Sequence, residues 1–345
     1  MHELVTHLSQ GNHLTPKQII EAAAFLVDHG PTAETKAAFL KALSRKGETP
    51  DEIAGFVTEF LKLAVDPGIE AARLSGPMLD VVGTGGDKLN LFNISTTAVF
   101  ILAGGGVSMV KHGNRGITSK SGGADVLEAL GVKIDMPPEK LSRCVHEVGV
   151  GFVFAPLYHP SFAAVKEARA ILAREGLRSI FNVLGPLLNP AKPHYQLVGV
   201  FDPSLTDAFA QILLKLGRKA AWVVHGEANQ GQGMDELSTL GRNSVVEVKE
   251  GALNSFTLDP AELGYDRPAI ADLAGGDALV NADLLEGILA GRIKGPRRDI
   301  AVLNAAAGFV ITGKAPDIGE GRRLAEDVLD RGAAHAKLKA LQDFV

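Results

Sequence analysis

The chain has 345 residues, of which 46% are hydrophobic and 22% charged, and its 35 basic and 40 acidic residues give a net charge of −5. The length predicts about two domains of ordinary globular composition. The near balance of charge argues against a general nucleic-acid binder and against attachment to an anionic membrane. A single cysteine, Cys144, excludes an internal disulfide and a cysteine-based zinc site. We expect a cytoplasmic protein, because the first residues lack the pattern of a signal peptide and no apolar run reaches the ~18 residues of a membrane span.

Residues 1–73 show the periodicity of helices. Thr15 followed by Pro16 is typical of a helix start, and apolar residues at helical spacing follow it. Residues 49–52, Thr-Pro-Asp-Glu, form a capping box ahead of a second apolar stripe. Three short helices of this kind cannot bury their apolar stripes alone. We therefore expect a small all-helical N-terminal domain that pairs with a second copy, which makes the protein a homodimer.

From Leu79 onward, short apolar segments alternate with glycine turns and helical patterns. This alternation predicts an α/β domain over residues 74–345, with a mainly parallel central sheet flanked by helices. The parallel strands are expected at 79–82, 107–110, 151–154, 196–200 and 221–224. Residues 245–248 are expected to form an edge strand in an antiparallel pair, and helices are expected at 162–175, 282–289, 301–311 and 321–339.

The first of these strands ends in a glycine-rich turn, Gly83-Thr84-Gly85-Gly86-Asp87. A strand that breaks into such a turn is where an α/β sheet presents ligands. Lys88 stands where the dinucleotide fingerprint needs its third glycine, and no P-loop lysine follows, so neither NAD nor ATP binding is favoured. Residues 93–96 then place Asn, Ser and Thr at the start of an apolar helix, which is more polar groups than one N-cap requires.

The segment 111–123, Lys-His-Gly-Asn-Arg-Gly-Ile-Thr-Ser-Lys-Ser-Gly-Gly, collects positive charge among glycines directly before a helix. Glycines let the backbone approach an anion, and the helix start offers unpaired N–H groups. Lys111, Arg115 and Lys120 supply compensating charge. The pattern indicates a phosphate site more strongly than a surface loop with solvated charges.

Asp235 and Glu236 follow the strand at 221–224 and its glycine turn. Alone, an Asp-Glu pair is more often a solvated surface pair. Beside two phosphate loops it suits Mg²⁺, which is held by one or two carboxylates and takes further ligands from water and substrate phosphates. The sequence therefore predicts Mg²⁺ together with a phosphorylated substrate.

In this order along the chain, the motifs resemble those of the anthranilate phosphoribosyltransferase family. The segments that carry the resemblance are residues 83–87, 93–96, 111–115, 121–131, 181–187 and 235–236. Of these, Lys-His-Gly-Asn-Arg and Asn-Val-Leu-Gly-Pro-Leu separate the family from the pyrimidine nucleoside phosphorylases, which share its architecture. The resemblance implies a two-domain homodimer in which residues 161–178 return to the helical domain.

The resemblance also implies an activity. A glycosyltransferase of this family moves the 5-phosphoribosyl group from phosphoribosyl pyrophosphate to the amine of anthranilate, releasing pyrophosphate, in the second step of tryptophan biosynthesis from chorismate. A related phosphoribosyltransferase or nucleoside phosphorylase with another acceptor is the alternative. An aromatic amine is already neutral near pH 7, so no residue is expected to act as an acid or base, and Lys111 is expected to stabilise the leaving group.

Site residues follow from the same resemblance. The expected donor-binding residues are Gly83, Gly86, Asp87, Asn93, Ser95, Thr96, Lys111, Asn114, Arg115, Ser119 and Gly123. Ser95, Asp235 and Glu236 are expected to bind Mg²⁺ directly or through water. Gly123 and Leu91 stand where the family usually has Ser and Thr, so two hydroxyl groups expected near the phosphates are replaced.

The acceptor, anthranilate, is expected to contact Gly83, His112, Asn114 and an arginine that meets its carboxylate. Arg169 is the preferred arginine and Arg174 the alternative, because the stretch that carries them looks slightly longer than is usual in the family. On one helix the two would point about 140° apart, so both cannot face one pocket well.

Overall fold

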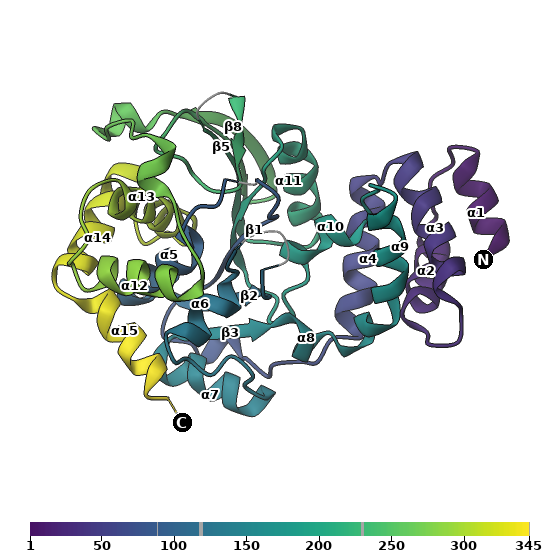
Figure 1. The fold of residues 1–345 in the computed structure, drawn as a ribbon, viewed down its shortest axis with the longest axis horizontal. Coiled ribbons are helices and arrows are strands. Elements are labelled where there is room, and N and C mark those ends of the chain that lie inside the picture. The colour runs from purple at the N-terminus through teal and green to yellow at the C-terminus, as the bar shows by residue number, and fades with distance from the viewer. Residues whose placement is uncertain (88, 117–119, 229–230, 345) are drawn as a thin grey trace. The chain divides into compact units, whose positions relative to one another are not determined.

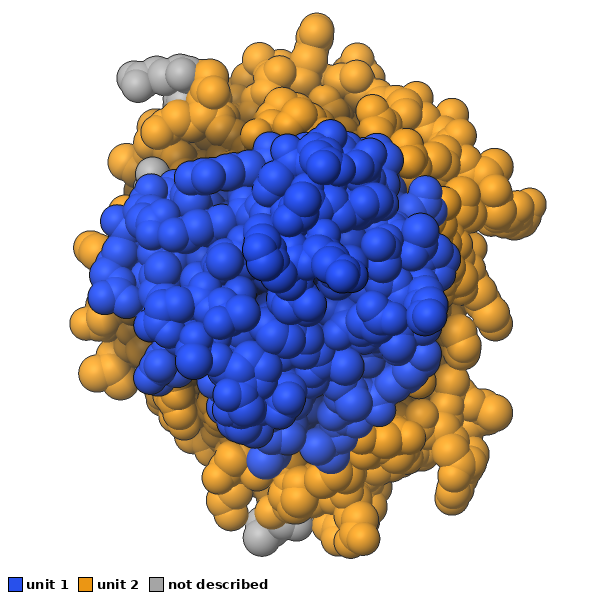
Figure 2. Space-filling model, turned by 90° about the vertical axis from the view of Figure 1, so that its right-hand side faces the viewer, with its two compact units in different colours: residues 1–65, 156–190 blue, residues 66–155, 191–345 orange. Residues whose placement is uncertain are grey.

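The computed structural model describes residues 1–87, 89–116, 120–228 and 231–344 (Figure 1). It divides the chain into two compact units, coloured separately in Figure 2. The first consists of residues 1–65 and 156–190, and the second of residues 66–155 and 191–345. The expected boundaries lay at residue 73 and at 161–178. Residues 66–73 group with the second unit, where the Ser142 hydroxyl donates a hydrogen bond to the Gly68 carbonyl at 2.8 Å. Among the described residues, every helix is too short or too polar to span a bilayer.

The helical unit begins with four helices where the periodicity predicted three. They are α1 (His2–Ser9), α2 (Pro16–Val27), α3 (Ala33–Lys46) and α4 (Pro50–Lys62). The extra helix is α1, which starts at Met1 without a side-chain cap and so gives no start signal. The predicted caps are confirmed, because Thr15 and Thr49 each form a capping box with the residue three positions later.

Residues 156–190 complete this unit through aromatic packing. The segment contains most of α8 (Ala155–Tyr158), then η2 (Pro160–Val165), α9 (Lys166–Arg174), α10 (Phe181–Leu184) and η3 (Gly185–Leu187). Phe60 of α4 meets the rings of Phe162 and Phe181 with centroids 5.1 and 5.6 Å apart. The buried ammonium of Lys36 donates to the carbonyls of Asp28 and Ala164 at 2.5 and 2.8 Å. These contacts bind the returning segment to the N-terminal helices.

The second unit is built on one twisted sheet, which confirms the predicted α/β class. Its strands are β1 (Met78–Gly83), β2 (Ser108–Gly113), β3 (Val150–Phe154), β4 (Tyr195–Gly199), β5 (Ala220–Glu227), β6 (Gly233–Met234), β7 (Asn243–Lys249) and β8 (Ala252–Leu258). They lie in the order β3-β2-β1-β4-β5-β7-β8, with β6 beside β5. The strands β1 to β5 are parallel, and β7 runs antiparallel to both β5 and β8.

One strand assignment was wrong: residues 245–248 do not form the edge. They lie in β7, and β8 covers β7 on its outer side. β8 is mostly exposed and contains Asn254, Ser255 and Thr257, so it lacks the apolar pattern by which the other strands were found.

Helices cover both faces of this sheet. They are α5 (Ile94–Gly104), α6 (Gly123–Ala129), α7 (Pro138–Val148), α11 (Thr206–Lys215), α12 (Ala278–Leu289), α13 (Pro296–Ile311), α14 (Ile318–Asp330) and α15 (Ala333–Gln342), with short 3₁₀ turns at Ala71–Arg73, Pro203–Leu205, Pro260–Leu263 and Ile270–Leu273. α5 and α13 pack on one face and α11 on the other (Figure 1). The helix expected at 321–339 is two helices, because Gly332 has a φ of 73° and ends the run.

Candidate active site

The carboxyl ends of β1 and β4 meet at one edge of the sheet, and the segment that carries Asp235 crosses them. Gly83 ends β1 and is paired in register with Gly199, which ends β4. A Cβ atom at Gly83 would collide with the Asp235 carboxylate, and one at Gly199 would collide with the Asp235 carbonyl. Only glycine fits at either strand end. The chain reverses its direction of strand addition between β1 and β4, which is where open α/β sheets bind ligands.

Asp235 and Glu236 each accept a hydrogen bond from the backbone of another segment. The N–H of Gly85 donates to Asp235 Oδ2 at 2.6 Å, and the N–H of Ser95 donates to Glu236 Oε1 at 3.2 Å. Ser95 lies in the first turn of α5, so Glu236 faces the positive end of that helix. The glycine turn, the start of α5 and the two carboxylates therefore form one site.

Burial disfavours the charged forms of three carboxyl groups in this site, those of Asp87, Asp235 and Glu236. The pKa of Asp235 lies well above its ordinary value because of burial, and the nearby charges of Asp87 and Glu236 raise it further. Burial raises the pKa of Glu236 to about 7, although the charge of Lys111 opposes the rise. Burial also raises the pKa of Asp87. A cation bound among these groups would stabilise their ionised forms.

Lys111 supplies a buried positive charge at the centre of the site. It lies in β2 with 6% of its surface exposed, and its ammonium donates to the Val81 carbonyl at 2.6 Å and to the Ser95 hydroxyl at 3.3 Å. Burial lowers its pKa, and the charges of Asp80, Glu236 and Asp235 oppose that effect. The ammonium thus lies between β1 and the start of α5, close to the acidic pair.

The start of α6 approaches the same point from the side of the basic loop. Gly122 is its N-cap, and the Asp125 carboxylate accepts hydrogen bonds from the N–H groups of Gly122 and Gly116, both at 2.8 Å. A Cβ atom at Gly123 would lie 3.3 Å from Thr96 Oγ1 and 3.5 Å from Lys111 Cε. Gly123 therefore leaves room beside two predicted donor-binding residues, where a serine would sit tightly.

Residues 114–116 and Lys120 of the basic loop are exposed, and its arginine, Arg115, is already paired. Arg115 forms ion pairs with Glu128 and, at 3.6 Å, with Asp125, and its guanidinium lies 5.6 Å from the centre of the Phe154 ring. Asn114 accepts a hydrogen bond from the Arg115 N–H at 2.8 Å. Ser119, which the resemblance assigned to the donor, lies outside the described residues.

The glycine turn after β1 has the backbone that its sequence requires. Gly85 and Gly86 have φ values of 71° and 95°, which favour glycine strongly. Asp87 then accepts a hydrogen bond from the Leu89 N–H at 3.2 Å. The turn therefore places glycine backbone, without side chains, and the Asp87 carboxylate on the Asp235 side of the site.

The predicted acceptor residues divide between the two units. His112 is buried in the α/β unit, while Arg169 and Arg174 lie on α9 of the helical unit. The Arg169 guanidinium lies 5.3 Å from the centre of the Phe181 ring, and its burial lowers its pKa. Arg174 is exposed and donates to the Ala170 carbonyl at 3.3 Å. Arg169, which the resemblance preferred, is thus half-buried, whereas Arg174 is exposed.

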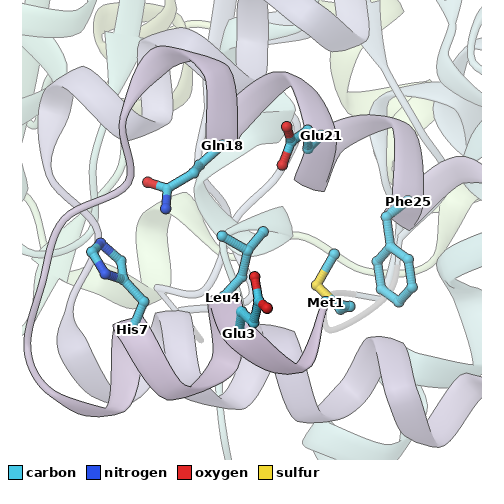
Figure 3. Close-up of a pocket in the computed structure, with 7 residues that line it drawn as sticks. All are labelled: Met1, Glu3, Leu4, His7, Gln18, Glu21 and Phe25. Atoms are coloured by element: carbon cyan, nitrogen blue, oxygen red, sulfur yellow. The ribbon is translucent and has the colours of Figure 1, made fainter.

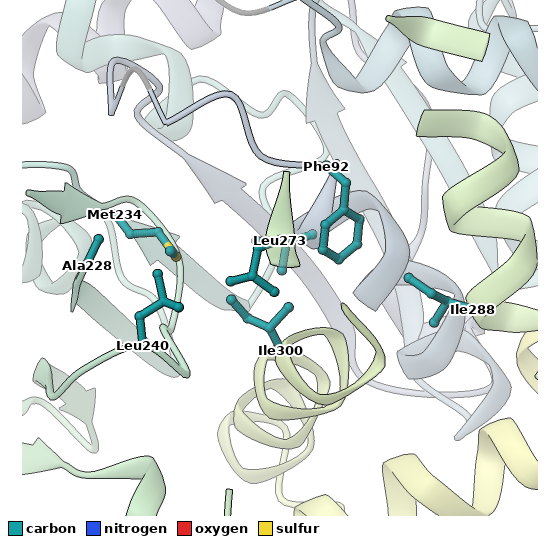
Figure 4. Packing of buried hydrophobic residues seen from close by; sticks show 8 residues of the cluster. Phe92, Ala228, Met234, Leu240, Leu273, Ile288 and Ile300 are labelled. Atoms are coloured by element: carbon teal, nitrogen blue, oxygen red, sulfur yellow. The ribbon is translucent and has the colours of Figure 1, made fainter. Parts of the chain in front are cut away.

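Leu91, which replaces the family's usual threonine, has a packing role. Its backbone bridges to Ala274, and its side chain packs against the buried apolar cluster around Phe92, Leu273 and Ile300 (Figure 4). An apolar residue is favoured there because the cluster lies on the inner side of the chain that leads into α5.

Sequence reasoning missed Asp80, which supports the site from beneath. It is fully buried in β1, and its Oδ1 accepts a hydrogen bond from the backbone N–H of His112 at 3.2 Å. Its charge also opposes the lowering of the Lys111 pKa by burial. A single charged residue inside an apolar strand was a signal that could have been used.

Two buried asparagines that hold the segment after Glu236 were also missed. Asn304 of α13 accepts from the Leu237 N–H at 3.0 Å and donates to the Leu237 carbonyl at 2.9 Å. Asn243 does the same for Ser238, at 2.7 and 3.0 Å. Nothing local in the sequence connects these residues to the carboxylates, because the contacts span up to 67 positions.

A separate hollow in the helical unit has the wrong chemistry for a phosphate. It lies between α1 and α2 and is lined by Met1, Glu3, Leu4, His7, Gln18, Glu21 and Phe25 (Figure 3). Two of its side chains are acidic and none is a lysine or arginine, so a polyphosphate would be repelled. The cationic and carboxylate groups needed for a phosphorylated substrate and its metal lie instead at the strand ends.

Comparisons with known proteins agree with this architecture. Residues 2–64 match the glycosyl transferase family helical bundle domain, and residues 75–335 match the a/b domain of that family. An anthranilate phosphoribosyltransferase of Moorella thermoacetica is 42% identical over 342 residues, which cover 99% of this chain and 97% of the relative. One from Methanocorpusculum labreanum is 47% identical over 304 residues, covering 88% and 86%.

Solved structures give the same result. The anthranilate phosphoribosyltransferase of Thermus thermophilus matches with a TM-score of 0.89 at 38% identity, covering 99% of this chain and 98% of the other. That of Saccharomyces cerevisiae in complex with phosphoribosyl pyrophosphate and Mg matches with a TM-score of 0.87 at 25% identity, covering 99% and 96%.

A helical bundle joined to an α/β domain with this strand-end site defines a two-domain glycosyltransferase. The extent of the likeness narrows the assignment further. The chain belongs to the anthranilate phosphoribosyltransferase family, which confirms the resemblance and the enzyme class predicted from the sequence.

Proposed function

We propose that this protein transfers the 5-phosphoribosyl group of phosphoribosyl pyrophosphate to the amine of anthranilate, a step of tryptophan biosynthesis. The observation that carries the proposal is the joint position of Asp235, Glu236 and Lys111 at the strand ends, where the acidic pair and a buried ammonium lie within one set of hydrogen bonds. Such a site suits a reaction that expels a charged diphosphate.

The donor is proposed to bind along the backbone-rich side of the site. Its ligands are Gly83, Gly86, Asp87, Asn93, Ser95, Thr96, Lys111, Asn114, Arg115, Ser119 and Gly123. The N–H groups at the start of α5 and in the glycine turn suit phosphate oxygens. Lys111 neutralises charge that develops on the leaving pyrophosphate. Arg115 must exchange its ion pair with Glu128 for a phosphate to contribute.

Mg²⁺ fits the acidic side of the site. Asp235 and Glu236, with Ser95 beside them, would hold the ion directly or through water, and the ion supplies charge neutralisation of the pyrophosphate. Across the described residues, no three His, Cys, Asp or Glu side chains come together as a complete metal cage. This donor set suits a metal whose coordination is completed by substrate phosphates and water.

Anthranilate is proposed to lie between Gly83, His112 and Asn114, with Arg169 pairing with its carboxylate. A guanidinium can bind a carboxylate through two parallel hydrogen bonds, which fixes the orientation of the ring and its amine. The amine is neutral at pH 7 and attacks ribose C1 without prior loss of a proton. Positioning and charge neutralisation therefore account for the chemistry, and no general base is assigned.

The test is a pyrophosphate-release assay with purified protein, phosphoribosyl pyrophosphate, Mg²⁺ and anthranilate. The proposal predicts release that depends on anthranilate, with N-(5-phosphoribosyl)anthranilate identified by mass spectrometry. Phosphate-dependent cleavage of a pyrimidine nucleoside, without anthranilate-dependent release, would favour the nucleoside phosphorylase alternative.

We further propose that the helical unit pairs with a second copy. Within this unit Ile20, Leu63 and Leu157 each expose more than a third of their surface, which is unusual for large apolar side chains. Light scattering after size-exclusion chromatography should give twice the chain mass of 36.3 kDa. Replacing Ile20 and Leu63 by Asp should shift the mass toward the monomer if these residues form the interface.

A further inference from the structure

Asn281 lies 188 residues from Asn93 in the sequence and contacts it directly. Asn281 belongs to the first turns of α12, and 1% of its surface is exposed. We propose that Asn281 is a positioning residue that orients the Asn93 carboxamide toward phosphoribosyl pyrophosphate. This inference rests on the proposed function of the site, since it assigns to Asn93 a contact with that donor.

Three hydrogen bonds connect Asn281 to the far side of the site. The backbone N–H of Gly276 donates to Asn281 Oδ1 at 2.8 Å, and Asn281 Nδ2 donates to Asn93 Oδ1 at 2.9 Å. Asn93 Nδ2 then donates to the backbone carbonyl of Ser121 at 3.2 Å. The series therefore runs from the segment before α12, through both amides, to the turn before α6.

Backbone groups at both ends allow only one orientation of the two amides. The Gly276 N–H can only donate, so Asn281 must turn its oxygen toward it and its NH₂ toward Asn93. The Ser121 carbonyl can only accept, so Asn93 must turn its NH₂ toward it. Both requirements are met by the same arrangement, in which Asn93 presents its oxygen to Asn281. One N–H of Asn93 and one lone pair of its oxygen are left over for a ligand.

The backbone around Asn93 is held without help from Asn281. The Phe92 N–H donates to the Leu273 carbonyl at 3.2 Å, and the Gly275 N–H donates to the Asn90 carbonyl at 2.9 Å. Phe92 and Ile94 are both buried in the apolar cluster that includes Leu273 (Figure 4). The residues on either side of Asn93 are thus fixed, and rotation of its partly exposed carboxamide is the freedom that remains.

Asn281 removes that freedom. Without the Asn281 NH₂ group, only the 3.2 Å hydrogen bond to the Ser121 carbonyl opposes rotation of the Asn93 amide, so the amide more often presents its oxygen where the donor requires an N–H. With an acceptor in place of that NH₂, the Asn93 amide is driven to rotate, because its own NH₂ would then turn toward residue 281 and away from Ser121. Asn281→Ala therefore loosens the orientation of the Asn93 carboxamide, and Asn281→Asp reverses it.

The experiment measures KM for phosphoribosyl pyrophosphate and for anthranilate, with kcat and melting temperature, in these two variants. Loss of one oriented hydrogen bond predicts a donor KM raised about 10-fold, with anthranilate KM within about twofold of wild type. Asn281→Asp should have the larger effect. An equal rise in both KM values, or no change in either, overturns the proposal.

Asp277→Ala is the matched control. Asp277 caps the same helix by accepting from the Val280 N–H at 3.0 Å, and its removal loosens the start of α12 without removing the Asn281 amide. The proposal predicts a lower melting temperature with unchanged donor KM. If Asp277→Ala raises donor KM as much as Asn281→Ala does, the role of Asn281 is only structural and the proposal fails.

A double-mutant cycle completes the test, with calorimetric binding of phosphoribosyl pyrophosphate and Mg²⁺ as a second readout. In the Asn93→Ala background, Asn281→Asp should weaken donor binding by less than twofold, because the group it orients is absent. Additive losses would overturn the positioning role. Failure of the proposed function is recognised by a different result. The wild-type protein would then release no pyrophosphate in response to anthranilate, whatever the effects of the two substitutions on donor binding.

Discussion

The donor side of the proposed site and the arginine proposed for the acceptor belong to different units and are held differently. In the α/β unit, Lys111 is buried and Asp235 and Glu236 are half-buried, and all three are hydrogen-bonded to the backbone of β1, the glycine turn or the start of α5. In the helical unit, Arg169 lies against an aromatic ring on α9. The groups proposed for the donor are thus held by one sheet, whereas the arginine proposed for the acceptor lies in the other unit. Substitutions should separate the two substrates accordingly.

The largest effect is expected from removing the acidic pair. Asp235→Asn combined with Glu236→Gln removes the charge that would hold Mg²⁺ against the pyrophosphate, and kcat/KM should fall by roughly 10³-fold or more. Stopped assays over a range of Mg²⁺ concentrations measure this loss, and circular dichroism checks the fold. Near-normal turnover of the folded double variant would remove these residues from the mechanism.

The next effect concerns the leaving group. Lys111→Ala removes the buried ammonium beside Ser95, and kcat/KM for the donor should fall on the order of 10²-fold. Melting temperature should not fall in proportion, because the ammonium is a charge buried at an energetic cost. A sharp loss of melting temperature in a variant whose folded fraction is fully active would show that Lys111 is structural.

The acceptor side is tested by two arginines of one helix. Arg169→Ala should raise KM for anthranilate by about 10- to 50-fold, since a charge-assisted pair with its carboxylate is lost. Arg174→Ala is the matched control and should change it by less than twofold, because Arg174 is exposed. A selective anthranilate defect in Arg174→Ala, with Arg169→Ala near wild type, would reverse the assignment.

The smallest effect is a dependence of stability on pH in the absence of Mg²⁺. Burial raises the pKa of Glu236 from an ordinary value of 4.5 to about 7, so the folded protein binds the proton more tightly than the unfolded chain does. The free energy of unfolding should therefore fall as pH rises between about 4.5 and 7, by at most about 3 kcal/mol. Chemical denaturation should show this slope in wild type and a reduced slope in Glu236→Gln. An identical slope in both would exclude Glu236 as its source.

Sequence patterns predicted the helices and strands whose signals lie within a few neighbouring residues. Strand, glycine turn and helix repeat within a few tens of residues, so the parallel sheet and most helices could be predicted. The edge strand β8 could not, because its residues are polar and exposed and it is defined by pairing with β7. The helix α1 was also missed, because it begins without a capping side chain and so gives no start signal in the sequence.

The site shows the same limit. Gly83, Lys111 and Asp235 stand in short motifs whose chemistry points to phosphate and metal, and the structure brings the three segments together. Asn281 and Asn304 act across 188 and 67 positions, in helices with no local mark of a binding site. The ion pair between Arg115 of the basic loop and Glu128 of α6 was likewise not predicted, because the number of charges in a segment does not show which of them pair.

The central claim is that the α/β unit binds the donor and that Arg169 serves only the acceptor. Binding of phosphoribosyl pyrophosphate and Mg²⁺ in the absence of anthranilate tests this claim most directly. Titration calorimetry would compare wild type with Lys111→Ala and Arg169→Ala. We expect Arg169→Ala to bind the donor within about twofold of wild type and Lys111→Ala to bind it at least 10-fold more weakly. A loss of donor binding in Arg169→Ala equal to that in Lys111→Ala would contradict this claim.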